Sequence, residues 1–185
     1  MTLGPLTPRA LRTCVACAAL PVALAGCGTS RVSAPMAAPV LTPRHVEVVR
    51  DGEGWTLLRE GRPYRVRGVG FTGRLDGVRS IGANSVRTWG TGPDARAFRD
   101  VSEARGLSVT QGLWLGHVGH GFDWHDAEAL AEQRARVRRD VLALRDHPAL
   151  LFWGLGNEME IDNDDPAMWA EVGELAAMVR ERDPH

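Results

Sequence analysis

Leu150-Leu-Phe-Trp-Gly-Leu-Gly156, followed at once by Asn157 and Glu158, is the most informative segment of this chain. The apolar run is too short for a typical helix and follows His147-Pro148, so it predicts a strand buried on both faces. Catalytic groups of parallel α/β folds lie at the carboxyl ends of strands, which makes Glu158 a candidate general acid/base. The residue types alone fit an ordinary loop equally well, because Asn and Glu are common where helices begin.

Composition limits the function classes. The 185 residues allow one domain of ordinary size, and a hydrophobic content of 44% is enough for a packed core. The formal net charge of -1 gives no basic footprint for nucleic acid. All 22 basic residues are arginines, which excludes a Schiff-base lysine and a phosphate-loop lysine. We therefore expect no cofactor and no nucleic-acid partner.

The first 26 residues have the pattern of an export signal. Arg9 and Arg12 precede an uncharged apolar segment, residues 13–26, whose length suits a signal-peptide core and is too short for a membrane span. All 3 cysteines of the chain lie at or before Cys27. Residues 1–26 are therefore interpreted as a signal peptide.

Leu24-Ala-Gly-Cys27 resembles the bacterial lipobox, in which cleavage leaves a cysteine as the new N-terminus with lipid on its sulfur. The resemblance implies lipidation of Cys27, removal of Cys14 and Cys17, and a mature domain without a disulfide. It also implies an exported protein of the cell envelope, lipid-anchored to a bacterial membrane. A conventionally cleaved or uncleaved signal is the alternative, since small residues precede both kinds of cut.

Three further segments follow the signal. Residues 27–44 are rich in Ala, Pro, Ser and Thr, which predicts a tether. Residues 45–65 predict a β-hairpin element, because two apolar-containing runs flank Asp51-Gly-Glu-Gly54. We expect this element to cap the entrance of a barrel formed by residues 66–185.

Residues 66–185 alternate between strand and helix patterns, which predicts an α/β fold with a parallel sheet and right-handed crossovers. The expected strands are residues 66–70, 85–89, 108–115 and 150–155; the expected helices are residues 75–81, 94–105 and 127–145, and one that starts at Asp165-Pro166. A full (β/α)8 barrel has eight such units in about 250 residues, so about half of one is present. We expect both edge strands to expose apolar faces, covered by the other half-barrel in a longer chain or in another copy.

Three motifs in order resemble retaining glycoside hydrolases of the (β/α)8-barrel clan. Trp153-Gly-Leu-Gly-Asn-Glu158, after Arg145-Asp-His-Pro-Ala149, resembles the acid/base strand. Ala83-Asn-Ser-Val-Arg-Thr-Trp-Gly90 resembles the second strand of family 2-like TIM-barrel catalytic domains. Gly112 to His117 with Gly119 to Trp124 resembles the third strand and its loop. The resemblance implies hydrolysis of O-glycosidic bonds in a β-linked carbohydrate by a retaining double displacement.

Roles for individual residues follow from this resemblance. Glu158 would be the general acid/base, and Asn157 would hydrogen-bond the 2-hydroxyl of the sugar. Arg87 would orient the nucleophile glutamate, which in the clan lies far downstream and is missing here. The other expected substrate contacts are tryptophans and histidines near the strand ends, namely Trp89, Trp114, Trp124, His117 and His120. Trp153 fits core packing equally well.

No acid of this chain convincingly supplies the nucleophile, so we expect the chain alone to be nearly inactive. Glu160 is too near Glu158, and the remaining loop acids are interpreted as solvated or helix-capping carboxylates: Asp123, Asp126, Asp162, Asp164 and Asp165. The loop histidines lack the spacing of metal ligands, so no metal site is expected. A non-catalytic carbohydrate-binding lipoprotein and an inactive truncated remnant are the alternatives.

Overall fold

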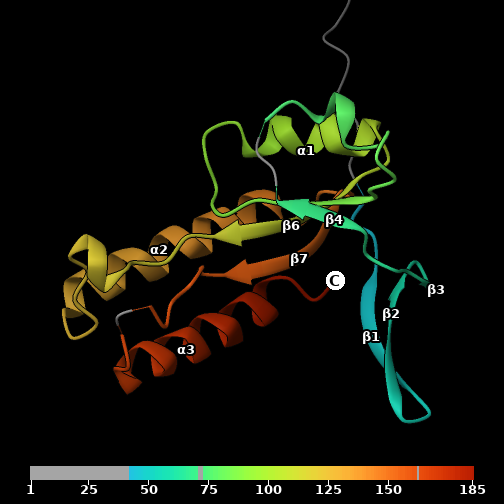
Figure 1. Cartoon of the computed structure of the whole chain (residues 1–185). Coiled ribbons are helices and arrows are strands. Elements are labelled where there is room, and N and C mark those ends of the chain that lie inside the picture. Colours follow the sequence, from blue (N-terminus) through green and yellow to red (C-terminus); the bar gives the residue numbers. More distant parts are fainter. Residues whose placement is uncertain (1–41, 71–72, 162) are drawn as a thin grey trace, which may run out of the picture. The chain divides into compact units, whose positions relative to one another are not determined.

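The computed structural model describes residues 42–70, 73–161 and 163–185 (Figure 1). The expected signal peptide, Cys27 with its lipobox, and most of the tether lie outside the described residues, as does Asp162. In the part of the chain that the structure describes, no helix combines the length and the apolar character needed to cross a membrane.

A 4-stranded parallel sheet in the order β4-β5-β6-β7 forms the centre of the described chain (Figure 1). Its strands are β4 (Gly68–Gly70), β5 (Ser85–Arg87), β6 (Ser108–Leu113) and β7 (Leu150–Leu155). All four predicted strands are present, although β4 starts later than expected and β5 and β6 end earlier. The prediction of an α/β fold with a parallel sheet is therefore confirmed.

Three helices connect or follow these strands: α1 (Ala95–Ala104), α2 (Ala127–Leu144) and α3 (Pro166–Arg182). Asp126 begins α2 by accepting hydrogen bonds from the backbone amides of Glu128 and Ala129, at 2.9 and 3.1 Å. Asp165 caps α3 in the same way, with Pro166 in the first turn. These two acids are helix caps, as the sequence predicts.

The expected helix at residues 75–81 is wrong in length. Only a 3-10 turn, η1 (Leu75–Gly77), forms there, and a second 3-10 turn, η2 (Val118–His120), lies after β6. Gly82 has a left-handed φ of 83°, which turns the chain toward β5. Gly77, the last residue of η1, and Gly82 disfavour a longer helix here.

Two apolar clusters fill the space between the sheet and the helices. Val86 and Val109 pack in one cluster with Leu107 and Ala149, against Phe98 of α1. The other cluster joins the carboxyl end of β6 to residues of α2 and α3, namely Leu113, Leu115, Val137, Val141, Met168, Leu175 and Val179. The apolar residues of α3 thus face the core.

An ion pair also joins α2 to α3. The carboxylate of Glu171, only 4% exposed, accepts hydrogen bonds from two nitrogens of Arg134. Hydrogen bonding to Glu171 raises the pKa of Arg134. Arg134 and Glu171 thus link two neighbouring helices.

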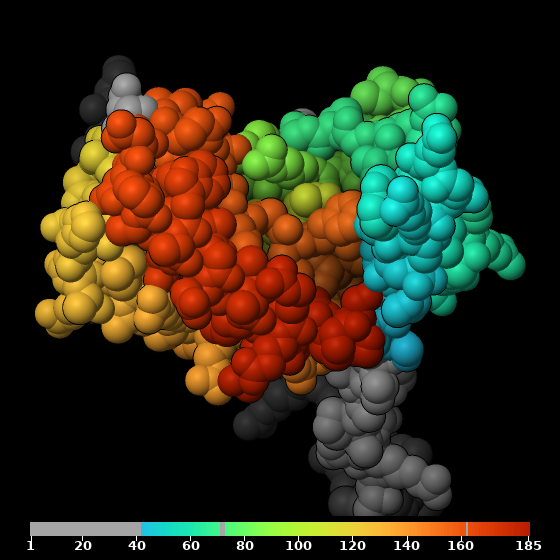
Figure 2. Space-filling model, turned by 90° about the horizontal axis from the view of Figure 1, so that it is seen from below, coloured from blue at the N-terminus to red at the C-terminus, as the bar shows by residue number. Residues whose placement is uncertain are grey.

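The sheet face that points away from the helices carries mainly small and polar residues. Strand alternation separates this face from Val86 and Val109, and pairing aligns Gly70 with Arg87 and Arg87 with Thr110. The residues of this face are Gly68, Gly70, Ser85, Arg87, Ser108, Thr110, Gly112 and Gly154, with Phe152 as the large apolar member. Of the two edge strands, β7 leaves Phe152 to Leu155 half-exposed, as expected, whereas the fully exposed residues of β4 are Gly68 and Gly70. The expectation of apolar exposed faces is therefore met in part by β7 and not by β4. Figure 2 shows β7 (orange) at the surface between α3 (red) and the hairpin (blue-green), as expected for an edge strand.

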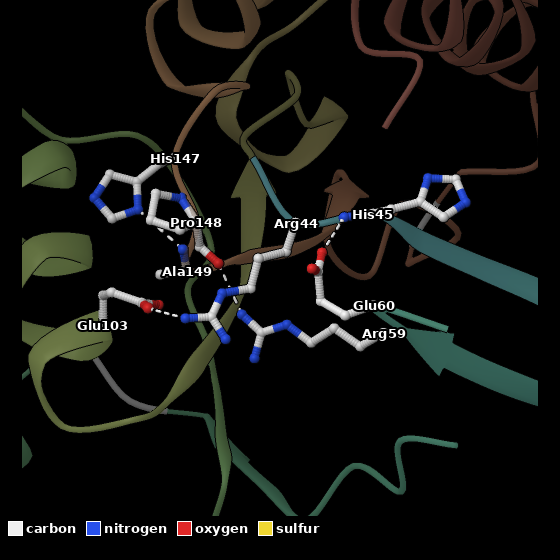
Figure 3. A network of polar contacts seen from close by, with 8 residues as sticks. All are labelled: Arg44, His45, Arg59, Glu60, Glu103, His147, Pro148 and Ala149. Carbon is white, nitrogen blue, oxygen red and sulfur yellow. Dashed lines mark hydrogen bonds and ion pairs between the residues drawn. The ribbon is translucent and has the colours of Figure 1, made fainter. Parts of the chain in front are cut away.

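The predicted hairpin is present, but its location differs from the prediction. Strands β1 (Val46–Asp51) and β2 (Gly54–Arg59) pair antiparallel, and β3 (Arg62–Pro63) extends them. Arg59 donates to the carbonyl oxygen of Pro148 at 2.7 Å, just before β7 (Figure 3). The hairpin therefore covers the amino ends of the parallel strands, and the expectation that it caps the entrance is wrong. The reason is connectivity, because the short segment after β3 leads directly into the amino end of β4.

A second link ties this end of the molecule together. Arg44 forms an ion pair with Glu103 at the end of α1, and Glu60 accepts a hydrogen bond from the amide of His45 at 2.7 Å (Figure 3). The backbone amide of Val46 donates to the carbonyl oxygen of His185 at 3.1 Å. Polar contacts thus connect the hairpin and the residue before it to the end of α1, to the loop before β7 and to His185.

His147, in the loop before β7, is only 2% exposed. Its Nδ1 accepts a hydrogen bond from the amide of Ala149 at 3.1 Å, and its Nε2 donates to Asp100 at 3.0 Å. This arrangement needs a neutral ring, because a protonated Nδ1 has no lone pair to accept with. Burial lowers the pKa of His147.

His147 should make stability depend on pH. Since its pKa is lower in the folded chain than its ordinary value of 6.5, the unfolded chain binds the proton first as the pH falls. The free energy of unfolding should be highest above that value and decrease from there down to the lowered folded pKa. Urea denaturation at about pH 7.5 and about pH 5.5 measures the difference, which His147→Gln should reduce. An equal difference in the variant would contradict this role.

Candidate active site

The carboxyl ends of three adjacent strands bring most of the predicted site residues together. Arg87 ends β5, while Trp114 and His117 follow β6. Asn157 and Glu158 follow β7. Because the strands are parallel, these three ends lie at one edge of the sheet.

Asn157 is held by residues at the ends of β5 and β6. Arg87 Nη2 donates to Asn157 Oδ1 at 3.0 Å. A guanidinium has only donors, so this bond fixes the amide with Nδ2 directed elsewhere. His117 Nε2 lies 2.6 Å from the backbone carbonyl oxygen of Asn157. The carbonyl oxygen carries no proton, so Nε2 is the donor.

The chain on either side of Asn157 is left-handed. Gly156 has a φ of 69° and Glu158 has a φ of 51°. Glycine accepts this conformation without penalty, whereas a residue with a side chain is strained by roughly 1–3 kcal/mol. The turn sends Met159 into the core, where it is 6% exposed, and leaves Glu158 exposed at the rim. Strain of this kind is typical of functional sites.

Two exposed tryptophans stand at the same edge. Trp89 is 37% exposed and Trp114 is 38% exposed. The Trp114 ring is stacked with His117 and His120, with centroid distances of 5.5 and 6.1 Å. Trp89 lies over β4, since a Cβ added to Gly70 would be 2.9 Å from its ring. Flat apolar surfaces with polar neighbours suit the C–H face of a sugar ring.

Trp124 is not at this edge, and its assignment as a substrate contact is wrong. It is 3% exposed and packs edge-on against Phe122, with centroids 4.8 Å apart. Phe122 itself occupies the space above Gly116, where any Cβ would clash. The loop after β6 therefore folds back on the core, and Trp124 fills it.

Trp153 has a structural role, in agreement with the core alternative. Its Nε1 donates to Asp183 at 2.6 Å, and the guanidinium of Arg99 lies 5.4 Å from its ring centroid. Arg99 is fully buried, and burial lowers its pKa to about 10. These contacts link α1, β7 and the end of α3 without reaching the rim.

Gln133 is a site residue that sequence reasoning missed. It belongs to α2 and is 2% exposed, and its Oε1 accepts the backbone amide of Gly116 at 2.7 Å. The contact fixes the backbone immediately before His117. The available signal was a polar residue among the apolar positions of an otherwise amphipathic helix.

The remaining acids and histidines have ordinary partners or lie apart. Asp123 accepts the amide of His125 at 2.8 Å, and the His125 side chain lies 2.9 Å from Asp165. Glu160 and Asp164 are exposed loop residues. Among the described residues, no three His, Cys, Asp or Glu side chains gather in a way that would hold a metal ion.

Comparison with solved structures identifies the fold class. A β-glucuronidase from Ruminococcus gnavus, in complex with C6-substituted uronic isofagomine, has a TM-score of 0.59 and 18% identity. The match covers 77% of this chain and 26% of that one. The apo form has a TM-score of 0.56 and 18% identity, with 77% and 27% covered. An exo-chitosanase from Amycolatopsis orientalis has a TM-score of 0.49 and 20% identity, with 74% and 18% covered.

The two β-glucuronidase structures are those of a glycoside hydrolase, and at this identity the likeness shows a common fold. The chain spans about a quarter of the length of the β-glucuronidases it matches. No protein-family model matches the chain, and a search of the curated proteins finds no match. The fold class is thus a parallel α/β sheet of the kind present in these glycosidases.

Gly156→Ala tests the turn that precedes Glu158. The new Cβ would clash with Met159 Sδ, and the residue would need a φ of 69°, so we expect a loss of roughly 1–3 kcal/mol in the free energy of unfolding. Gly173→Ala is the matched control. This position in α3 has open space and should gain roughly 0.5–1 kcal/mol. Equal effects of the two substitutions in urea denaturation would contradict the assigned strain.

Proposed function

We propose that this chain is the N-terminal half of a retaining glycoside hydrolase, with Glu158 as the general acid/base. The observation that carries the proposal is the arrangement around Asn157. Arg87 and His117 fix this residue, and the exposed Glu158 follows it in a strained conformation. The fold class supports the proposal, since the similar solved structures are β-glucuronidases.

The proposed reaction divides between groups on the two sides of a β-glycosidic bond. Glu158 protonates the leaving oxygen, and its carboxylate later activates the attacking water. Asn157 presents Nδ2, because Oδ1 already accepts from Arg87. Nδ2 then donates to the oxygen of the sugar 2-hydroxyl, a bond that strengthens as charge develops in the oxocarbenium-like transition state.

The nucleophile is a second carboxylate, about 5–5.5 Å from Glu158, that the other half of the barrel supplies. This half comes from the same longer chain or from another copy. A guanidinium has five N–H groups, and Arg87 uses one of them on Asn157. Another is directed at the incoming carboxylate in this proposal and stabilises its charge. The small and polar sheet face is suited to such a polar interior.

The substrate class and location complete the proposal. The two exposed tryptophans, Trp89 and Trp114, would stack on rings of an oligo- or polysaccharide, with His120 beside Trp114. Cys27 would carry the lipid that anchors the exported protein to a bacterial membrane. The residues between Cys27 and the hairpin then serve as the tether.

A carbohydrate-binding lipoprotein without turnover is the second candidate. The exposed rings of Trp89 and Trp114 favour it, because stacking on a sugar does not need a nucleophile. Saturable binding of a glycan by the complete protein, without any hydrolysis, would identify this function instead.

The substitution Glu158→Gln tests the proposed activity directly. It is made in the longest form of the protein that its source organism produces. Turnover of unactivated β-glycosides should fall by roughly 10²–10⁴-fold, since a general acid of this kind contributes that much. Dinitrophenyl glycosides should lose less in their first step, because their leaving group needs no proton. Glu160→Gln is the control, since Glu160 is exposed two residues away. Equal losses in both variants, or none in Glu158→Gln, would reject the role of Glu158.

A further inference from the structure

His117 occupies a position that sequence reasoning assigned to substrate contact, yet its ring is bonded to the protein. We propose that His117 is a positioning residue, which holds the turn carrying Glu158 through the carbonyl oxygen of Asn157. The inference rests on the proposed function for its catalytic consequence. Its structural content stands on the geometry alone.

The bond itself defines the state of the ring. His117 Nε2 and the Asn157 oxygen are 2.6 Å apart, and only a protonated Nε2 can donate there. The ring is half-buried, whereas His120 in the same loop is exposed. Trp114 lies against His117 at 5.5 Å with an interplanar angle of 30°. The N–H group at Nε2 is therefore already used in the bond to Asn157 and is not free to donate to a sugar.

The backbone of His117 is fixed independently of this bond. Its carbonyl oxygen accepts the amides of His120 and Phe122, each at 3.0 Å. The preceding residue, Gly116, donates to the buried Gln133 of α2 at 2.7 Å. The imidazole thus projects from a loop held by the core and by α2, so it can hold a turn on the adjacent strand.

The turn after β7 needs contacts with other parts of the chain to keep its conformation. Glu158 has a φ of 51°, a conformation that persists only where the surroundings impose it. Met159 anchors one side of the turn in the core, and Arg87 holds the side chain of Asn157. His117 supplies the remaining contact to the backbone of Asn157. Loss of this donor should therefore release the backbone at Asn157 and Glu158.

NMR of the chain tests the structural content without any enzyme assay. In the unsubstituted protein, long-range nitrogen–proton correlation should show His117 protonated at Nε2. His117→Ala should move the Asn157 and Glu158 amide resonances and shift the Glu158 coupling away from the value for its left-handed φ. His117→Gln keeps an amide donor and should restore much of the original spectrum. His120→Ala is the matched control and should leave the Glu158 coupling unchanged, since His120 shares the Trp114 stack without the bond to Asn157.

The catalytic consequence is tested in the complete enzyme. A positioning role predicts that His117→Ala lowers kcat by about tenfold or more while KM stays within about twofold, with partial recovery in His117→Gln. A raised KM at constant kcat would make His117 a substrate ligand and overturn the proposal. Unmoved Asn157 and Glu158 resonances in His117→Ala would also overturn it. If His117→Ala does not fold, the protonation of the native ring and the spectrum of His117→Gln decide. The expected spectra without any glycosidase activity would uphold the positioning role and reject the proposed function.

Discussion

Parallel pairing of β5, β6 and β7 is the constraint on which the candidate site depends. It brings the carboxyl ends of three strands to one edge, so that Arg87 at the end of β5 and His117 after β6 both reach Asn157 after β7. On the face toward the helices, two apolar clusters pack the sheet against α1, α2 and α3. Local strain at Glu158 is sustained because the surrounding contacts over-determine the turn. The geometry of the candidate site therefore depends first on the pairing of the strands and second on its side chains.

Much of the fold was predictable from the sequence, for identifiable reasons. The strand predicted at residues 150–155 matches β7 in both bounds, because an apolar run between a proline and polar residues permits little else. The expected burial on both faces is wrong, since only Leu150 and Leu151 are buried in this edge strand. Asp126 and Asp165 marked the starts of α2 and α3 through their capping chemistry. The meeting of Arg87, His117 and Asn157 also follows from strand order, once the sheet is taken as parallel.

The errors share a physical origin in contacts between residues distant in sequence. Trp124 and Trp114 belong to one loop, and only the packing of Phe122 above Gly116 decides that Trp124 turns inward. The connection to β4 places the hairpin at the amino ends of the strands, and the contact between Arg59 and Pro148, 89 positions apart, holds it there. The bond from His117 to a backbone carbonyl of the adjacent strand is of the same kind. Residue type does not reveal which of several polar partners a side chain selects.

The proposed mechanism is tested most directly by measuring whether the 185-residue chain, purified alone, hydrolyses β-glycosides. The proposed mechanism requires a second carboxylate from the other half of the barrel. It therefore predicts no hydrolysis above the level of the same chain carrying Glu158→Gln, and hydrolysis with retained anomeric configuration once the missing half is supplied. Turnover by the monomeric chain alone, abolished by Glu158→Gln, would contradict the requirement for that second half.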